Sequence, residues 1–149
     1  MKGTVKWVEG MAFDATTDSQ HTIRLDAAAE TGGQDQGPRP LEMLLVSLGG
    51  CTGMDVISIL KKMRQDVTGY EVNLDGERAT EHPKVFTSIV VEHVVRGRNL
   101  SEDAVRKAVE LSAQKYCSVG AMLGKSAKLE HTYRIVEESD VLPADVAHA

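Results

Sequence analysis

Two cysteines, Cys51 and Cys117, are the side chains with the most distinctive chemistry in this 149-residue chain. A thiolate can act as a nucleophile or a metal ligand once its pKa is low enough. In a reducing compartment such a pair is either redox-active or part of the hydrophobic core, because structural disulfides are rare there. The spacing leaves both possibilities open, since a disulfide requires two separate helices to bring the Cα atoms within about 7 Å of each other.

Three glycines, Gly49, Gly50 and Gly53, surround Cys51 in an otherwise apolar helical run. Each costs roughly 1 kcal/mol in a helix interior, so we expect close backbone packing, a kink or a break at this point. A break would place Cys51 near a new helix N-terminus, where the helix dipole favours the thiolate. Asp55, one turn further on, would oppose that activation if it faced the sulfur, and we expect it on the solvated or interface side of the helix.

The elements that must position the cysteines form a single α+β domain over residues 1–149. Period-two alternation predicts strands, and apolar runs with helical spacing predict helices. The predicted segments are an antiparallel meander (1–26), a Gly- and Pro-rich loop (27–40), a central helix with Cys51 (40–65), strands (69–97), a second helical region with Cys117 (101–124), a last strand (129–137) and a frayed tail (138–149). The central helix is apolar on nearly every side in its first half, which predicts burial on more than one face.

Composition argues against several classes of partner. The net charge is −5 and the Lys and Arg residues are scattered, which disfavours nucleic acid and a basic membrane-surface helix. We see no apolar run of the roughly 20 residues that span a bilayer and no signal pattern, so we expect a cytoplasmic protein with no membrane partner. The five histidines occur without CxxC or HxxxH spacing, so we expect no metal and no other cofactor.

Two segments of the chain carry a family resemblance. GPRPLEMLLVSLGGCTGMDV together with LSAQKYCSVGAML resembles the two-cysteine signature of the OsmC/Ohr family of thiol-dependent hydroperoxide reductases. The resemblance extends from Trp7 to Tyr133, and both motifs occur in the family's order. Within the family the chain is most similar to a less characterised branch with the motifs PLE-x-LL-x-x-LGGCT-x-x-DV and KYCSV.

The resemblance implies a fold and a reaction. The implied OsmC-like fold has antiparallel sheets wrapped around two central helices in an intertwined homodimer. In the implied reaction, Cys51 attacks an organic or inorganic hydroperoxide and becomes a sulfenic acid, and Cys117 condenses with it to a disulfide. An external small-molecule or protein dithiol then restores both thiols, as part of the defence against oxidative stress. A nearby second thiol protects a sulfenic acid from further oxidation, which agrees with this scheme.

The chain departs from the organic-hydroperoxide branch at an acid. In that branch a glutamate directly follows the proline, whereas here Leu41 follows Pro40 and the acid is Glu42. One residue along a helix is a rotation of about 100°, so Glu42 points in a different direction. We keep Glu42 as a candidate catalytic residue, with an equal alternative as a first-turn residue favoured by the helix dipole.

A second departure concerns the cation beside the thiolate. The branch places an arginine in the first hairpin, but WVEGMAFDATT contains none. A positive group within about 4–6 Å would lower the thiol pKa, so another cation must replace it in an efficient reductase. Arg39 is our candidate, and Arg78, Lys6 or a partner-chain residue are the alternatives.

These departures keep two other functions open. The same fold and thiols could bind or sense a small apolar or electrophilic molecule at a dimer-interface pocket. Alternatively, both cysteines could be core residues of a structural protein. The peroxidase remains our leading prediction.

Overall fold

The computed structural model describes residues 1–139, and these fall into two compact units. The first unit is Met1–Val46 and the second begins at Ser47, so the boundary lies inside the long helix α1 (Pro40–Lys62). The tail predicted at 138–149 lies mostly outside the described residues.

The first unit is built on an antiparallel meander of three short strands in the order β1-β2-β3. The strands are β1 (Gly3–Glu9), β2 (Ala12–Thr17) and β3 (Thr22–Leu25). Gly10 has a φ of 53°, which suits the tight turn between the first two strands. A loop with one short 3-10 turn, η1 (Ala29–Thr31), then leads to α1.

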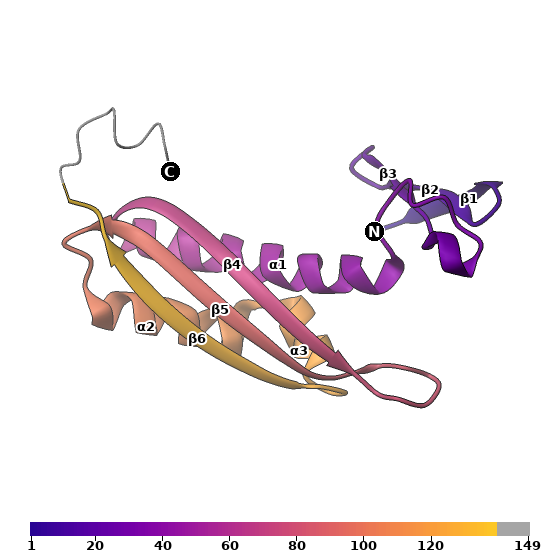
Figure 1. The fold of residues 1–149 in the computed structure, drawn as a ribbon. Coiled ribbons are helices and arrows are strands. Elements are labelled where there is room, and N and C mark those ends of the chain that lie inside the picture. Colours follow the sequence, from indigo (N-terminus) through magenta and orange to yellow (C-terminus); the bar gives the residue numbers. More distant parts are fainter. Residues whose placement is uncertain (140–149) are drawn as a thin grey trace. The chain divides into compact units, whose positions relative to one another are not determined.

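The second unit contains a three-stranded sheet in the order β4-β5-β6. Its elements after α1 are β4 (Asp66–Arg78), β5 (Phe86–Arg98), α2 (Glu102–Leu111), the π-helical η2 (Ser112–Tyr116), α3 (Ser118–Leu123) and β6 (Lys128–Glu137). Figure 1 shows the three long strands running side by side, with the helical crossover between β5 and β6. The predicted α+β class is confirmed.

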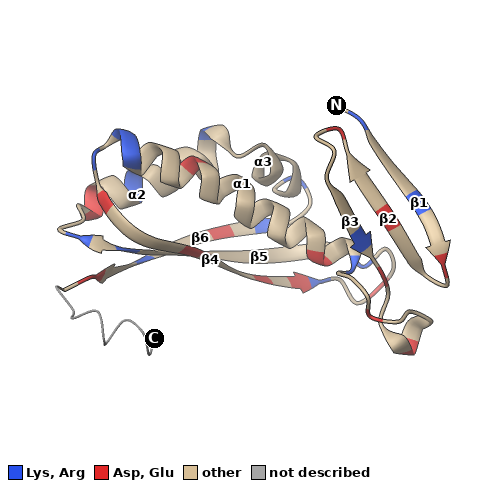
Figure 2. Cartoon of the chain, turned by 90° about the horizontal axis from the view of Figure 1, so that it is seen from above, with Lys and Arg blue, Asp and Glu red and all other residues tan. Residues whose placement is uncertain are grey.

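One feature of the predicted sheets is wrong, because β5 and β6 pair in parallel. The helical segment α2–η2–α3 returns the chain to the end of the sheet where β5 began, as a crossover between parallel strands requires. The pair β4–β5 is antiparallel, so this sheet is mixed. Figure 2 shows the helices over one face of it and acidic and basic residues interspersed along its elements.

The core of the second unit lies between that sheet face and the helices. Its fully or nearly fully buried members come from α1, β5 and α2, and they are Val56, Leu60, Val95, Val105, Ala108 and Val109. Alternate residues of β5 face this core, whereas Val90 lies on the opposite face and is 39% exposed. The two-residue period of the strand therefore sorts its side chains into a helix-facing set and an outer set.

This sorting predicts the effects of a matched pair of substitutions. Val95→Ala should lower the free energy of unfolding by about 2–3 kcal/mol, because it removes two buried methyl groups and leaves a cavity. Val90→Ala, the same change on the outer face of the same strand, should cost less than about 1 kcal/mol. Urea unfolding of both variants measures the difference, and equal losses would contradict the assignment of the two faces.

The helix α1 is continuous from Pro40 to Lys62, so of the three alternatives left open for the glycines the structure excludes a break. A Cβ at Gly49 would lie 2.7 Å from the Leu74 side chain, and one at Gly53 would lie 3.4 Å from the Tyr70 ring. A Cβ at Gly50 would meet open space. Gly49 therefore lets α1 approach β4 closely, whereas a Cβ at Gly53 would make an ordinary contact with Tyr70.

By length and composition alone, α1 also passes the test for a membrane-spanning helix, contrary to the sequence expectation that no run is apolar enough. Its most apolar window has a mean hydropathy of 1.8, and 28% of that window is buried within the chain. The core helix of a soluble protein can have the same length and composition. The finding does mark a large apolar surface on α1.

Candidate functional site

The two cysteines lie together in the second unit, joined by one carboxylate. The sulfurs of Cys51 and Cys117 and an oxygen of Asp55 all lie within 4.8 Å of one another. Cys51 and Asp55 project from α1, whereas Cys117 comes from the junction between η2 and α3. Cys51 is half-buried and Cys117 is buried, with 4% of its surface exposed. Neither is bonded in a disulfide.

The sulfur at a helix start is that of Cys117. Cys117 has an extended backbone conformation and caps the short helix α3, and the backbone N–H of Gly120 donates to its Sγ at 3.2 Å. Its own N–H donates to the carbonyl of Ser112 at 2.9 Å, which closes the π-helical turn before it. Cys51 lies in the middle of α1, so the alternative in which a break places it at a new helix N-terminus does not apply.

Burial raises the pKa of the Cys117 thiol to about 11. Burial is the largest cause of this rise; the Gly120 N–H acts against it, and the Cys51 side chain and the Asp55 charge act in the same direction as burial. Among the described residues, no lysine or arginine contributes to this shift. Cys117 is therefore a neutral thiol at physiological pH, even though it caps a helix.

Asp55 is held in place by two buried hydroxyl groups. Ser112 donates from Oγ to Asp55 Oδ2 at 3.0 Å, and Thr52 Oγ1 lies 2.7 Å from Ser112 Oγ. Thr52 and Ser112 are fully buried. Asp55 is half-buried and lines an open cavity, and it also lies beside both sulfurs, so it faces the cysteines from the cavity side of α1. Its i, i+4 spacing from Cys51 was the signal available in the sequence, since such residues share a helix face.

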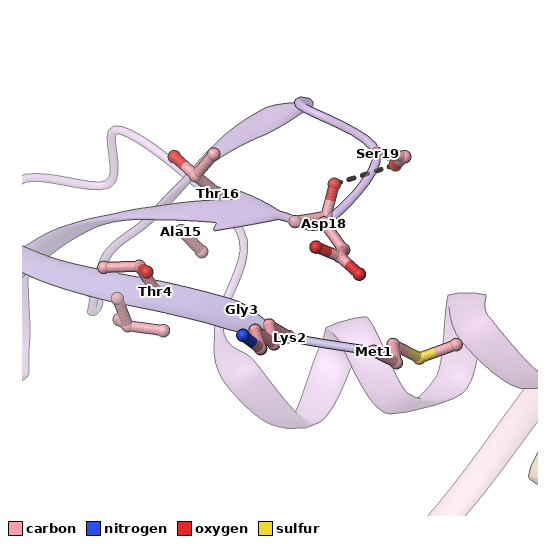
Figure 3. Close-up of a pocket in the computed structure, with 10 residues that line it drawn as sticks. Met1, Lys2, Gly3, Thr4, Ala15, Thr16, Asp18 and Ser19 are labelled. Atoms are coloured by element: carbon pink, nitrogen blue, oxygen red, sulfur yellow. Dashed lines mark hydrogen bonds between the residues drawn. The ribbon is translucent and has the colours of Figure 1, made fainter.

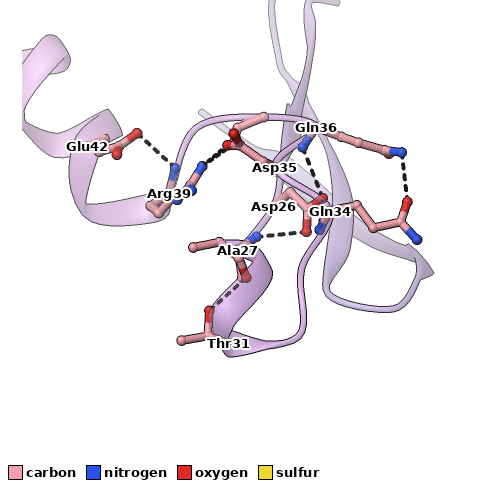
Figure 4. Close-up of polar contacts among 10 residues, drawn as sticks. Asp26, Ala27, Thr31, Gln34, Asp35, Gln36, Arg39 and Glu42 are labelled. Atoms are coloured by element: carbon pink, nitrogen blue, oxygen red, sulfur yellow. Dashed lines mark hydrogen bonds and ion pairs between the residues drawn. The ribbon is translucent and has the colours of Figure 1, made fainter.

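Glu42 and Arg39 form a local cap at the start of α1, within the first unit. The Glu42 carboxylate accepts the backbone N–H of Arg39 at 3.2 Å, which is one of the two hydrogen bonds of a capping box. The Arg39 guanidinium donates to Asp35 at 2.5 Å and to the Gly37 carbonyl at 3.2 Å. Figure 4 shows these contacts together with the neighbouring loop network around Asp26.

The two alternative cations are also placed by the structure. Arg78 Nε donates to the Lys84 carbonyl at 2.9 Å, across the connection between β4 and β5. Lys6 lies on the exposed strand β1. Neither is among the groups that shift the pKa of Cys117.

A cavity of about 410 Å³ borders the thiol site, because Asp55 forms part of its wall. The remaining lining residues are Ser58, Ile59, Lys62, Met63, Leu111 and Tyr116. A larger hollow of about 770 Å³ lies in the first unit against residues 1–5 and 15–19, and Figure 3 shows the side chains that line it. Of these two hollows, the one lined by Asp55 is the one that includes a member of the cysteine cluster.

Comparison with known proteins assigns the chain to a family. The family of OsmC-like proteins matches residues 33–132. Protein YhfA of Escherichia coli K12 is 46% identical over 136 residues, which cover 91% of this chain and 98% of YhfA. The chain belongs to the OsmC-like protein family.

Solved structures agree with this assignment. A hypothetical protein from Aquifex aeolicus VF5 is 34% identical and superposes with a TM-score of 0.82, covering 93% of this chain and 97% of that one. An organic hydroperoxide resistance protein from Legionella pneumophila shares the fold at 10% identity, with a TM-score of 0.67 and coverage of 89% and 96%. The predicted OsmC-like fold is confirmed.

Beneath α1 this OsmC-like chain holds a buried polar array that the sequence did not reveal. The Tyr70 hydroxyl lies 2.6 Å from His93 Nδ1, and His93 Nε2 lies 3.1 Å from His131 Nδ1. A hydroxyl that donates to Nδ1 leaves the Nε2–H of neutral His93 to donate to His131. Burial and the neighbouring His131 lower the pKa of His93 to about 4, so the ring is neutral at pH 7.

The array predicts how stability depends on pH. In the unfolded chain histidine has a pKa of about 6.5. Between pH 6.5 and 4, His93 is therefore protonated in the unfolded state but neutral in the folded state. The free energy of unfolding should therefore have its full value above pH 6.5 and should fall by up to about 3 kcal/mol as the pH drops to 4. Urea unfolding at a series of pH values measures the slope, which His93→Gln should reduce. An identical slope in the variant would rule out His93 as its source.

Proposed function

We propose that this OsmC-like protein reduces hydroperoxides by thiol chemistry, with Cys51 as the attacking thiol and Cys117 as the resolving thiol. The proposal depends on one observation, the clustering of both sulfurs with Asp55 within 4.8 Å. A disulfide bond is about 2.05 Å long, so a modest side-chain movement would close it. The similarity to an organic hydroperoxide resistance protein supports the same class of substrate.

The reaction balances with the two thiols and one external reductant. The Cys51 thiolate attacks an oxygen of the peroxide, the O–O bond breaks, and the alcohol leaves with a proton. Cys51 is then a sulfenic acid, and the Cys117 thiol displaces its hydroxyl group as water to form the disulfide. A dithiol then reduces the disulfide by exchange and becomes a disulfide itself.

The unequal surroundings of the sulfurs support this division of roles. Cys51 is half-buried and is therefore the sulfur that a substrate reaches first. Cys117 is buried and its pKa is raised, so it stays protonated until a sulfenic acid forms beside it. Asp55 is placed to accept the Cys117 proton as the S–S bond forms and to pass it to the departing hydroxyl group.

Arg39 and Glu42 remain our candidates for supporting the Cys51 thiolate, and they would do so from the partner subunit, because within one chain about 13 Å of the continuous helix α1 separates Glu42 from Cys51. Their local contacts show a capping role for Glu42 and an ion pair for Arg39 with Asp35. Arg39→Ala would test the cation, because loss of a positive neighbour raises the pKa of a thiol and slows its attack. The capping role predicts instead a loss of helix stability in Glu42 variants.

A second candidate function is binding or sensing of a small electrophilic molecule. It is favoured by the absence of a cation among the described groups that shift the pKa of Cys117. The cavity of about 410 Å³ against Asp55 offers space for such a ligand. In this case Cys51 would form an adduct, and Cys117 would not turn it over.

We further propose that the protein acts in the cytoplasm as a homodimer. The support is the apolar surface of α1. Only 28% of the most apolar stretch of this helix is buried within one chain. The large apolar side chains that α1 leaves exposed are Leu44, Val46 and Met54. A second copy that covers this surface would remove it from water, which is the main driving force for association.

Thiol counting under peroxide distinguishes these functions. The reduced wild-type protein should lose both free thiols to one intramolecular disulfide on treatment with tert-butyl hydroperoxide, as seen by intact mass after alkylation. Addition of a dithiol should restore both thiols. If both thiols survive many equivalents of peroxide, the protein is not a hydroperoxide reductase. A stable adduct on Cys51 with an electrophile would then support the sensing function.

A further inference from the structure

The cluster of Cys51, Cys117 and Asp55 has the geometry of a metal site. Zinc binds sulfur at about 2.3 Å and carboxylate oxygen at about 2.0–2.2 Å, so its tetrahedral ligand atoms lie about 3.3–3.8 Å apart. The three ligand atoms here lie within 4.8 Å of one another. Small side-chain rotations would bring them to coordination distance without any change in α1.

The neighbours of the cluster orient it as the outer shell of a metal site does. Ser112 donates to Asp55 Oδ2, which fixes the carboxylate and leaves Oδ1 for an ion. Thr52 in turn contacts Ser112 at 2.7 Å. The Gly120 N–H holds the Cys117 sulfur at 3.2 Å. Such hydrogen bonds to ligand atoms fix their direction and strengthen metal binding.

The charges of the cluster also call for a cation. Two thiolates and a carboxylate would carry three negative charges in a partly buried place, and among residues 1–139 no lysine or arginine forms an ion pair with Asp55. A divalent ion supplies the missing positive charge, and a thiol that coordinates it is deprotonated outright. Thiolate ligands select soft ions of the zinc class over magnesium or calcium.

We propose that the reduced site binds one zinc-class divalent cation per subunit through Cys51, Cys117 and Asp55. Two S–metal bonds form, and the two thiol protons leave to solvent with no change of oxidation state. Three protein ligands leave the fourth position for water, as in zinc sites that remain open. This inference rests on the proposed function, because it concerns the same site. The bound ion would regulate the reaction with peroxide, since it occupies both sulfurs and shields them.

Binding is tested on the full-length reduced protein, freed of metal, by zinc competition against a chromophoric chelator. We expect one equivalent of zinc, the release of two protons in weakly buffered solution, and thiolate-to-metal charge-transfer absorption when Co²⁺ replaces zinc. Cys51→Ser and Cys117→Ser should each lower the zinc affinity by at least about 100-fold, and Asp55→Asn by about 10-fold. Asp75→Asn is the matched control, because Asp75 is exposed on the outer face of β4.

Two outcomes would overturn the inference. One is zinc affinity that is unchanged in both cysteine variants, which would mean that the ion binds elsewhere on the surface. The other is a wild-type protein that binds no zinc while its thiols are verified as reduced. The proton release and the Co²⁺ spectrum of the wild type keep the test informative if a variant fails to fold.

The same samples separate this inference from the proposed function. Zinc binding without peroxide-driven loss of thiols would refute the peroxidase alone, whereas disulfide formation without zinc binding would refute the metal site alone. If the peroxidase and the metal site are both correct, the zinc-loaded protein should lose its thiols to tert-butyl hydroperoxide at least about 10-fold more slowly than the metal-free protein. An unchanged rate would overturn the proposed shielding.

Discussion

Cys51→Ser should reduce the rate of hydroperoxide reduction by about a thousandfold or more, because it removes the nucleophile that the reaction requires. A serine hydroxyl cannot accept an oxygen atom from a peroxide, and the buried Cys117 with its raised pKa is a poor replacement. Peroxide consumption with excess dithiol measures the rate. The single remaining thiol should stay reduced on the timescale of wild-type turnover.

A matched control tests whether this loss comes from chemistry or from a disturbed helix. Gly50→Ala changes the residue beside Cys51, where an added Cβ meets open space. It should keep the wild-type rate and should stabilise the helix slightly, since alanine is favoured over glycine there. If Cys51→Ser retained more than a tenth of the wild-type activity, the attacking thiol would be wrongly assigned.

Cys117→Ser should have a different kinetic signature. Cys51 would still attack the first equivalent of peroxide, but no thiol would lie within reach of the resulting sulfenic acid. Turnover with a dithiol should fall by about 100-fold, and Cys51 should proceed to sulfinic and sulfonic acids that a dithiol does not reduce. Intact mass would show the successive addition of oxygen atoms, and a sulfenic-acid trap would capture the first product.

The neighbouring residue provides the control for this second variant. Ser118 follows Cys117 and is exposed at the start of α3, so Ser118→Ala should turn over like the wild type. Wild-type turnover in Cys117→Ser would show that the external dithiol attacks the sulfenic acid directly. Cys117 would then be a neighbour of the site without a resolving role.

Together the two variants also bear on Asp55. In the proposed scheme its carboxylate moves a proton only when the disulfide forms, so it has no part in the first attack. The cluster brings this acid within 4.8 Å of both sulfurs, and a hydrogen bond from Ser112 fixes its direction. A thiol with a pKa of about 11 gains most from a nearby base at the moment when it must lose its proton.

The sequence by itself determined the family, the α+β class and the approximate limits of the elements. These features follow from local patterns: strand alternation, apolar helical runs, and two cysteine motifs in a fixed order. The expectation that Gly49 allows close packing was also available, because glycine in a helix is costly without such a reason. The spacing of the glycines did not show whether they permit close helix packing or break the helix.

Only the tertiary structure decided which residues meet at the site. Cys51 lies inside a continuous helix. Cys117 is the residue that caps a helix, because the π-helical turn η2 ends at its extended backbone and α3 begins directly after it. Asp55 joins the sulfurs because α1 packs against the η2–α3 segment, which comes later in the chain, after β4, β5 and α2. Such contacts depend on how deeply and at what rotation helices pack, and these are properties of the whole core rather than of any local pattern.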